Sequence, residues 1–258
     1  MRNHSWLPFL FLFFIPAGIK AEFFVIKQYH IEVNFTKEGY ADFEETIEVE
    51  FSEARHGIFR FIPLHFTSEG RSLYWKLKNV KTPGYNFSTS RDGDNYVLVI
   101  GDRDTYVNGR QKYVIRYRLI NGLLYFKDHG QFYWDMLGSH WPVQIENTTF
   151  KINFPEKVDL TPEDVYVYSG VEGSKSNDVD LQVFPNAIHG KATRIFQPEE
   201  GLTIAVRFDP DEFQPPSFLS RLVSEHAMLL TIPLFLLAGF FAKYYARNRK
   251  QPIMTEFF

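Results

Sequence analysis

The residues best suited to chemistry lie in a short aromatic segment near the middle of the chain. The segment contains two indole rings, a carboxyl group and an imidazole. They belong to Trp134, Trp141, Asp135 and His140. Such a combination is typical of a groove that holds a sugar or a peptide, with Asp135 and His140 as polar contacts. Alternatively, the two indole rings fill the core and Asp135 closes a turn. The segment therefore predicts either a ligand-binding site or a core cluster.

A second group, His56 and Arg60, flanks an apolar centre. Arg60 has the side chain to bind a carboxylate or a phosphate. Alternatively, Arg60 satisfies backbone carbonyls where strands cross, and His56 lies in a turn. The sequence contains neither a Gly-x-Ser-x-Gly elbow nor a His-Glu-x-x-His motif, and the adjacent Ser139 and His140 are not a nucleophile and its base. We predict no catalytic residue, no cofactor and no metal site.

Acidic side chains follow one predicted strand at every second position. Such carboxylates stand ~7 Å apart along a strand, too far to share one cation without ligands from elsewhere. Arg116 and Arg118 form a basic stripe on another predicted strand, so we expect the two stripes to pair across neighbouring strands. A Ca²⁺ site or a basic partner is the alternative. The acidic residues are Asp42, Glu44, Glu48 and Glu50.

Alternation of apolar and polar residues organises the chain from residue 22 to residue 209, and turn signals separate the runs. This pattern predicts an all-β fold, an antiparallel β-sandwich that is Ig-like or elaborated. One sandwich and two small β lobes meeting near 142–150 are both compatible with it. The polar stretch 170–180 predicts a long loop, and Asn108-Gly109 predicts a turn. The alternating runs are 31–35, 43–51, 113–119, 150–154 and 202–208.

Two apolar segments flank this region, and they differ in length. Residues 6–18 are too few to cross a bilayer easily and follow a basic residue, which predicts a signal peptide over 1–21, or an uncleaved anchor. Residues 227–246 span ~30 Å as a helix, the thickness of the hydrocarbon core. A buried hairpin helix is the alternative for this second segment. We expect a transmembrane helix over 226–246.

These segments predict the order of parts along the chain. An exported β-domain over 22–209 precedes a Pro-containing stalk over 210–225, the membrane helix, and a short basic tail over 247–258. Because basic residues near a membrane helix favour the cytoplasm, the tail is expected inside. The protein is then a single-pass protein of the inner (plasma) membrane, in contact with the lipid bilayer through 226–246 and with its N-terminal domain outside.

Charge and cysteine content restrict the partners of the exported part. Residues 22–225 hold 30 acidic and 22 basic side chains, a net charge near −8 that disfavours nucleic acid as a partner. The chain has no cysteine. This excludes a thiol nucleophile and Cys-ligated metals, and it suits a bacterial periplasm better than an animal cell surface.

A further pattern is carried by the segments 39–51, 56–63, 113–121, 132–135, 141–143 and 201–206. Together these segments resemble the YciQ-like bacterial membrane proteins, also called domain of unknown function 2207. The resemblance implies an exported β-domain tethered to the inner membrane, and it implies no activity. Family members usually continue beyond the membrane helix, whereas this sequence ends soon after it, which predicts either a truncated or a pared-down relative.

The sequence therefore predicts a membrane-anchored envelope protein whose β-domain is a non-catalytic interaction or accessory module with an unknown envelope protein as partner. The alternative is a carbohydrate- or peptidoglycan-binding or -handling domain that uses the aromatic cluster near Trp134. A third hypothesis places the function in the membrane segment, which would assemble a larger membrane complex.

Overall fold

The computed structural model describes residues 23–68, 71–214 and 243. Among these residues, no helix has both the length and the apolar character needed to cross a membrane. The remaining predicted segments lie outside the described residues: the signal peptide 1–21, the stalk beyond residue 214, nearly all of the membrane helix 226–246, and the tail 247–258.

The described part is built from strands, as the alternation predicts. The largest sheet has seven strands, and β1 lies at its centre between β2 and β12. The pairing of β1 with β2 is antiparallel, whereas β1 and β12 run parallel, with Ile31 opposite Phe150. The prediction of purely antiparallel sheets is therefore wrong at this one pair. In sheet order the strands are β14 (Val179–Phe184), β15 (Ala187–Ala192), β12 (Thr148–Asn153), β1 (Phe24–Phe35), β2 (Ala41–Arg55), β9 (Val107–Ile120) and β6 (Lys76–Lys81).

Three smaller antiparallel sheets complete the fold, together with two short 3-10 turns, η1 (Pro162–Asp164) and η2 (Pro210–Glu212). The four-stranded sheet consists of β10 (Leu123–Tyr125), β11 (Gly130–Asp135), β16 (Gly201–Phe208) and β13 (Val165–Gly170), in that order. The three-stranded sheet consists of β3 (Gly57–Pro63), β8 (Asn95–Gly101) and β7 (Phe87–Asp92), and the hairpin of β4 (His65–Ser68) and β5 (Arg71–Tyr74) forms the fourth sheet.

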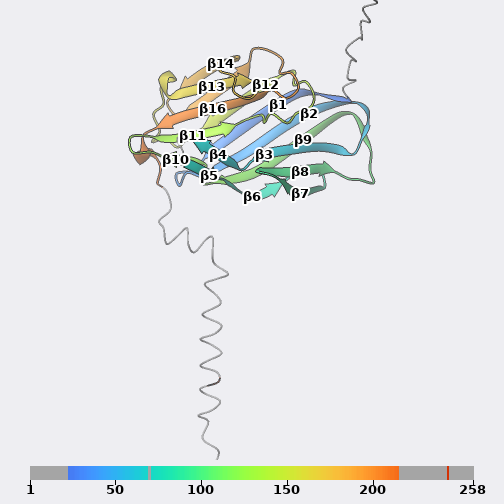
Figure 1. Ribbon diagram of the computed structural model, residues 1–258, viewed down its shortest axis with the longest axis horizontal. Helices are drawn as coiled ribbons and strands as arrows, with labels where there is room; N and C mark the ends of the chain where they lie inside the picture. The colour runs from blue at the N-terminus through green and yellow to red at the C-terminus, as the bar shows by residue number, and fades with distance from the viewer. Residues whose placement is uncertain (1–22, 69–70, 215–242, 244–258) are drawn as a thin grey trace, which may run out of the picture.

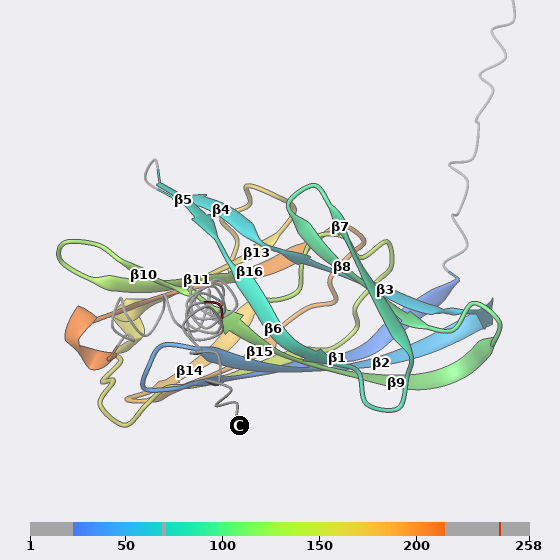
Figure 2. The same cartoon turned by 90° about the horizontal axis from the view of Figure 1, so that it is seen from below.

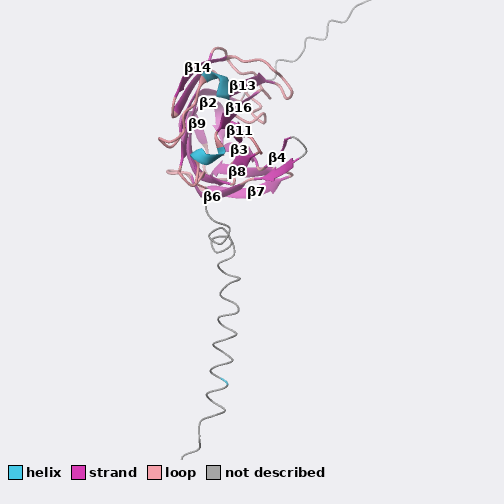
Figure 3. Cartoon of the chain, turned by 90° about the vertical axis from the view of Figure 1, so that its left-hand side faces the viewer, coloured by secondary structure: helices cyan, strands magenta, loops and turns pink. Residues whose placement is uncertain are grey.

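The long strands β1, β2 and β9 lie side by side and form one wall of the molecule (Figure 1). Seen from the side, β11 and β16 lie across from this wall, with β7 and β8 at its lower end (Figure 3). From below, the β4–β5 and β7–β8 hairpins both lie on the side away from β1 and β2 (Figure 2). Aromatic pairs join the layers: Phe35 meets Phe132 with ring centroids 4.9 Å apart, and Phe43 meets Trp134 at 5.1 Å.

A single hydrophobic core includes residues from both halves of the chain, from Ile26 to Phe213. Strands β12, β14 and β15, which begin at residue 148 or later, join the same sheet as β1. This arrangement favours one body over two separate β lobes, because the main sheet runs through the proposed boundary.

The outer face of β2 carries the acidic stripe, and the expected cross-strand pairing is confirmed. Residues directly opposite one another in the β2–β9 ladder bring the two charges together. Asp42 with Arg118 and Glu44 with Arg116, each at 2.6 Å, are such opposed pairs. Glu48 contacts Arg110 diagonally at 2.6 Å, because Arg110 is directly opposite Glu50.

One local prediction about the start of β9 is wrong. Asn108-Gly109 does not form a turn but lies within β9, where Gly109 has a φ of +59° opposite Phe51, next to a shift of the ladder register. A left-handed glycine is typical of such a bulge as well as of a turn. Residues 171–178, in contrast, connect β13 to β14 as a loop, as predicted.

Candidate functional site

The two tryptophans of the aromatic segment belong to the core. Trp134 is fully buried and Trp141 is 4% exposed. The Trp134 ring packs against Trp75 with centroids 4.8 Å apart, and the Trp141 indole N–H donates to the carbonyl of Leu137 at 3.0 Å. The core-filling interpretation of these indoles is therefore confirmed, and neither ring offers a free face to a ligand.

Asp135 lies on the opposite face of β11 from Trp134, because successive side chains of a strand point to opposite sides. Its Oδ1 accepts the backbone N–H of Gly138 at 2.8 Å, so it closes the expected turn. His140 is exposed and stacks on Phe61 with centroids 5.2 Å apart, and its charge is among the effects that oppose the raised pKa of Asp135. Of the four predicted site residues, Trp134 and Trp141 thus lie in the core, whereas Asp135 and His140 do not.

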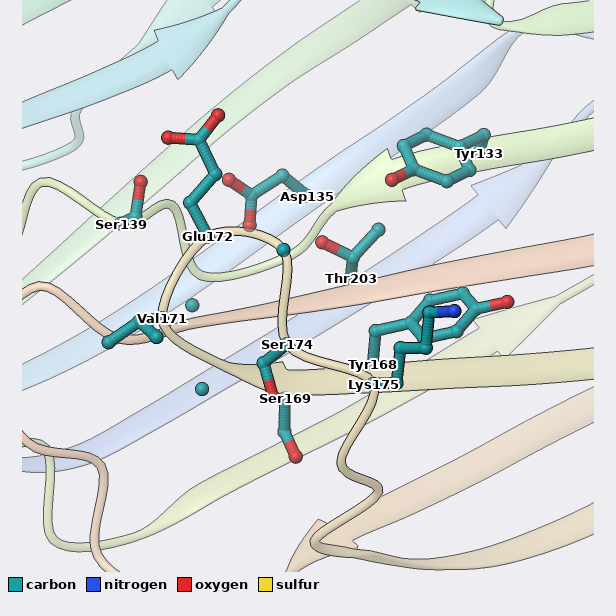
Figure 4. Close-up of a pocket in the computed structure, with 13 residues that line it drawn as sticks. Tyr133, Asp135, Ser139, Tyr168, Ser169, Val171, Glu172, Ser174, Lys175 and Thr203 are labelled. Carbon is teal, nitrogen blue, oxygen red and sulfur yellow. The ribbon is translucent and has the colours of Figure 1, made fainter. Parts of the chain in front are cut away.

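The face that carries Asp135 borders a pocket of about 440 Å³. It lies where β11 and β13 end and β16 begins, against the loop 171–175 (Figure 4). Antiparallel pairing brings these three strand ends to one edge of the sheet. The lining side chains include Tyr133, Asp135, Ser139, Tyr168, Glu172, Lys175 and Thr203. We call this the Tyr133–Tyr168 pocket.

The ladder register places the pocket's main side chains in one row. Thr203 of β16 is directly opposite Asp135 of β11 on one side and Tyr168 of β13 on the other. Directly opposed residues have Cβ atoms ~5 Å apart. A carboxyl group, a hydroxyl group and an aromatic ring therefore stand side by side across three strands, and Figure 4 shows them beside the loop.

Tyr133 stands one row further along the sheet and is held from one side. The ring of Phe66, on β4, stacks on it with centroids 3.9 Å apart and planes 16° from parallel. Burial raises the pKa of Tyr133, the charges of Asp135 and Tyr168 raise it further, and a hydrogen bond with Thr203 opposes the rise. Burial likewise raises the pKa of Asp135, although the Gly138 N–H and the charge of Arg60 oppose this.

The loop 171–175 is tied down at its base. The Ser169 hydroxyl donates to the Asp178 carboxylate at 2.8 Å, and the Ser169 N–H donates to the Ser176 carbonyl at 2.8 Å. Arg194 adds an ion pair to Asp178 at 2.9 Å, and these hydrogen bonds from Arg194 and Ser169 lower the pKa of the Asp178 carboxyl. The pocket wall is therefore fixed at both ends by polar contacts.

The structure also places the two residues of the second predicted group, His56 and Arg60, in different surroundings. The ring of His56 is exposed, and its Nδ1 lies 3.2 Å from the carbonyl oxygens of Asp102 and Thr105, in keeping with a turn. Arg60 is only 1% exposed and donates to the carbonyls of Phe61 and Met136, as the structural alternative predicts. It has no surface from which to bind an external anion.

The principal partner of Arg60 is Glu45, which sequence reasoning missed. Arg60 Nε and Nη2 donate to the two carboxylate oxygens of Glu45 at 2.8 and 3.0 Å. The hydroxyls of Tyr29 and Tyr117 donate to the same carboxylate at 2.6 and 2.7 Å. A signal was present in the sequence, because Glu45 occupies the same strand phase as the apolar Phe43, and that phase points into the core.

The electrostatics of this buried cluster keep both tyrosines protonated. Burial raises the pKa of Tyr29 and of Tyr117 well above the ordinary value, and the Glu45 carboxylate adds to the effect in each case. Burial acts against the charge of Arg60, but Glu45, together with Tyr29 and Tyr117, outweighs this effect, and the pKa of Arg60 is raised. Every group in the cluster is thus engaged with another, which indicates a structural role.

Within the described ranges, no group of three or more His, Asp or Glu side chains is placed to hold a metal ion. A smaller hollow of about 290 Å³ lies over the outer faces of β2 and β9, and its charged residues include the paired Asp42 and Arg118. The other ion pair at this hollow joins Glu44 to Arg116. The Tyr133–Tyr168 pocket is the larger of the two and is the candidate site.

Comparisons with solved structures give partial matches of the backbone. The native leukotriene A4 hydrolase from Saccharomyces cerevisiae matches over 71% of this chain and 29% of its own, with 11% identity and a TM-score of 0.43. An M1 zinc metallopeptidase from Deinococcus radiodurans matches over 70% of this chain and 42% of its own, with 10% identity and a TM-score of 0.35. Likenesses this distant say nothing about activity.

Sequence comparison gives a more direct relation. The "Uncharacterized protein YciQ" of Escherichia coli (strain K12) is 25% identical over 163 residues, which cover 57% of this chain and 25% of that protein. Residues 25–208 match the family described as "Predicted membrane protein (DUF2207) N-terminal domain". This range contains the whole four-stranded sheet and the Tyr133–Tyr168 pocket. The chain therefore belongs to the DUF2207 family of predicted membrane proteins, through their N-terminal domain.

Proposed function

We propose that the chain is a single-pass inner-membrane protein whose β-domain lies outside the cytoplasm and acts as a non-catalytic interaction module. The family supports a membrane setting. The signal-peptide-like segment 1–21 and the apolar segment 226–246 support export and a single anchor. In this proposal the facing layers of the β-domain form one elaborated β-sandwich, which the Phe35–Phe132 and Phe43–Trp134 contacts favour.

The observation that carries the interaction role is the aromatic outer face of the four-stranded sheet. Tyr166 is 41% exposed and Tyr168 is 37% exposed, both on the edge strand β13, and Val171 beyond them is 61% exposed. The guanidinium of Arg207 lies 5.5 Å from the centre of the Tyr166 ring. Tyrosine and arginine are enriched where proteins bind their partners, because each joins a large contact area to hydrogen-bonding groups.

The orientation of the chain in the membrane can be tested by cysteine labelling. The natural chain has no cysteine, so only an introduced cysteine can react. Tyr166→Cys should react with a membrane-impermeant maleimide in spheroplasts of intact inner membrane. Thr255→Cys, in the predicted cytoplasmic tail, should react only after the membrane is opened. Labelling of Thr255→Cys alone in closed spheroplasts would reverse the proposed orientation.

The interaction role is tested by placing the photo-crosslinking residue p-benzoylphenylalanine at Tyr166 in the full-length protein in cells. We expect a discrete adduct, identified by mass spectrometry, that disappears when Arg207→Glu is added. The matched control places the same residue at Tyr106, which is 67% exposed and lies outside this sheet. Identical adducts at both positions, or none at Tyr166, would contradict an interaction surface on this face.

A carbohydrate- or peptidoglycan-binding role remains the second candidate, but its site differs from the one the sequence favoured. Trp134 and Trp141 are in the core, so a ligand would contact Tyr168 and Asp135 instead. The specific observation in its favour is the row of Asp135, Thr203 and Tyr168 at the pocket wall.

A further inference from the structure

We propose that the Tyr133–Tyr168 pocket binds a small neutral saccharide, with the ring of Tyr168 as the stacking surface and Asp135 and Thr203 as hydrogen-bonding groups. The inference rests on the proposed function in one respect, since it takes the outer face of the four-stranded sheet as the binding face. It adds the chemical class of the ligand and the residues that recognise it.

The size of the pocket suits a small ligand. Sites for small molecules are typically ~300–1,000 Å³, and the volume here, about 440 Å³, falls in the lower part of that range. One or two sugar rings match such a volume better than a folded partner does. The fixed base of the loop, held by Ser169, Asp178 and Arg194, means that the wall is formed before a ligand arrives.

The side chains in the row match the two kinds of surface that a sugar ring presents. A pyranose has flat patches of C–H groups, which pack on an aromatic face, and a rim of hydroxyls. Tyr168, at 37% exposure, supplies ring surface at the pocket edge. Asp135 has Oδ1 engaged by Gly138, which leaves Oδ2 to accept sugar hydroxyls. The Thr203 hydroxyl also meets Tyr133 and keeps a lone pair that can accept a hydrogen bond from a sugar hydroxyl.

The charges around the pocket favour a neutral ligand. Asp135 and Glu172 are acidic and Lys175 is basic, and all three line the same space (Figure 4). A strongly anionic ligand would meet two carboxylates, and a strongly cationic one would meet the Lys175 ammonium. Hydroxyl groups, in contrast, can donate to the carboxylates and accept from the ammonium without adding a charge.

The test uses the full-length chain in lipid nanodiscs, prepared without sugar-headed detergents that would occupy the site. Glucose, N-acetylglucosamine, cellobiose and N,N′-diacetylchitobiose are titrated by calorimetry and by saturation-transfer NMR. We expect at least one to bind. Tyr168→Ala should weaken binding at least tenfold, Tyr168→Phe should retain it, and Thr203→Val and Asp135→Asn should each weaken it severalfold. Tyr106→Ala is the control and should leave the affinity unchanged.

Two further titrations test whether the pocket binds a charged ligand instead of a sugar. Butylamine and inorganic phosphate are titrated as a cation and an anion, and Tyr168-dependent binding of either in place of the sugars would overturn the ligand class. Absence of sugar binding, or binding that Tyr168→Ala does not change, would overturn the site. If the Tyr166-specific crosslink persists when sugars fail to bind, the saccharide inference is wrong and the interaction role stands. If neither the Tyr166-specific crosslink nor sugar binding is observed, the interaction role and the saccharide inference are both rejected.

Discussion

Glu45 and Arg60 form a two-pronged ion pair inside the core, with N–O distances of 2.8 and 3.0 Å and side chains that are 0% and 1% exposed. The pair ties the main sheet, through β2, to the three-stranded sheet, through β3. The two tyrosine hydroxyls of Tyr29 and Tyr117 complete the hydrogen bonding of the carboxylate. Such a pair is well compensated only while every member is present.

Removing one partner of this pair should be strongly destabilising. Arg60→Met leaves the Glu45 carboxylate buried without its cation, and we expect a loss of ~3–5 kcal/mol in the free energy of unfolding. Glu45→Met together with Arg60→Met should recover much of that loss, because no uncompensated charge remains. Denaturation of the full chain in micelles, followed by tryptophan fluorescence, measures both. A double variant as unstable as the single one would argue against this account.

The two tyrosine hydroxyls on Glu45 should matter, whereas a third buried hydroxyl should not. Tyr117→Phe removes a 2.7 Å hydrogen bond to the carboxylate, for which we expect a loss of ~1.5–3 kcal/mol. The matched control is Tyr113→Phe on the same strand, because the Tyr113 hydroxyl is buried and has no hydrogen-bond partner among the described residues. That variant should be neutral or more stable in the same denaturation experiment. Equal losses for both would show that packing, and not the hydrogen bond, decides the effect.

Gly57 and Gly101 face each other in the β3–β8 ladder, and each excludes a side chain. Their φ values are +130° and +134°, and a Cβ on either would lie 1.9 Å from a backbone carbonyl oxygen, of Ile100 or of His56. Gly57→Ala should therefore cost at least ~2–3 kcal/mol of stability. Gly109→Asn is the control, because Gly109 has a left-handed φ of +59° with open space around it, and asparagine accepts that conformation. A thermal melt that ranks the two variants in the opposite order would refute the prediction.

Asp135 should make stability depend on pH in a direction set by its raised pKa. Burial raises the folded-state pKa above the ordinary Asp value of ~3.9, so the folded protein binds more protons between the two values. Stability should therefore fall as pH rises through this window and stay level above it. Asp135→Asn removes the titration and keeps an oxygen for the Gly138 N–H. The melting temperature of this variant should rise relative to the natural protein as pH increases from 3.5.

Asp102 should make stability depend on pH in the opposite direction, and the same melting experiment tests it. The Asp104 N–H and the Asn86 amide lower its pKa, so the stability it contributes is present above the ordinary Asp pKa and is lost as pH falls through the lowered value. Asp102→Asn should therefore lose stability relative to the natural protein as pH rises from 2.5 to 4.5. A difference that is constant with pH in either variant would show that the carboxyl does not titrate as described.

The strands were predictable because their signal is local. The alternation around Phe43 and Ile47 identified β2, and the opposite signs of its outer face and of Arg116 and Arg118 correctly predicted that β2 and β9 are neighbours. The same alternation, followed strictly, would have placed Glu45 in the core. It would also have shown that Trp134 and Asp135 cannot line one groove, because adjacent residues of a strand face opposite sides.

The sequence by itself thus determined the β class, the phase of each long strand, the outer ion pairs and, through its motifs, the family. Only the tertiary structure decided the parallel pairing of β1 with β12, the burial of Arg60 against Glu45, and the pocket assembled from β11, β13 and β16. The reason is physical. The phase of a strand follows from period-two geometry over a few residues, whereas strand partners are selected by the simultaneous burial of many apolar faces, and this selection involves residues more than a hundred positions apart.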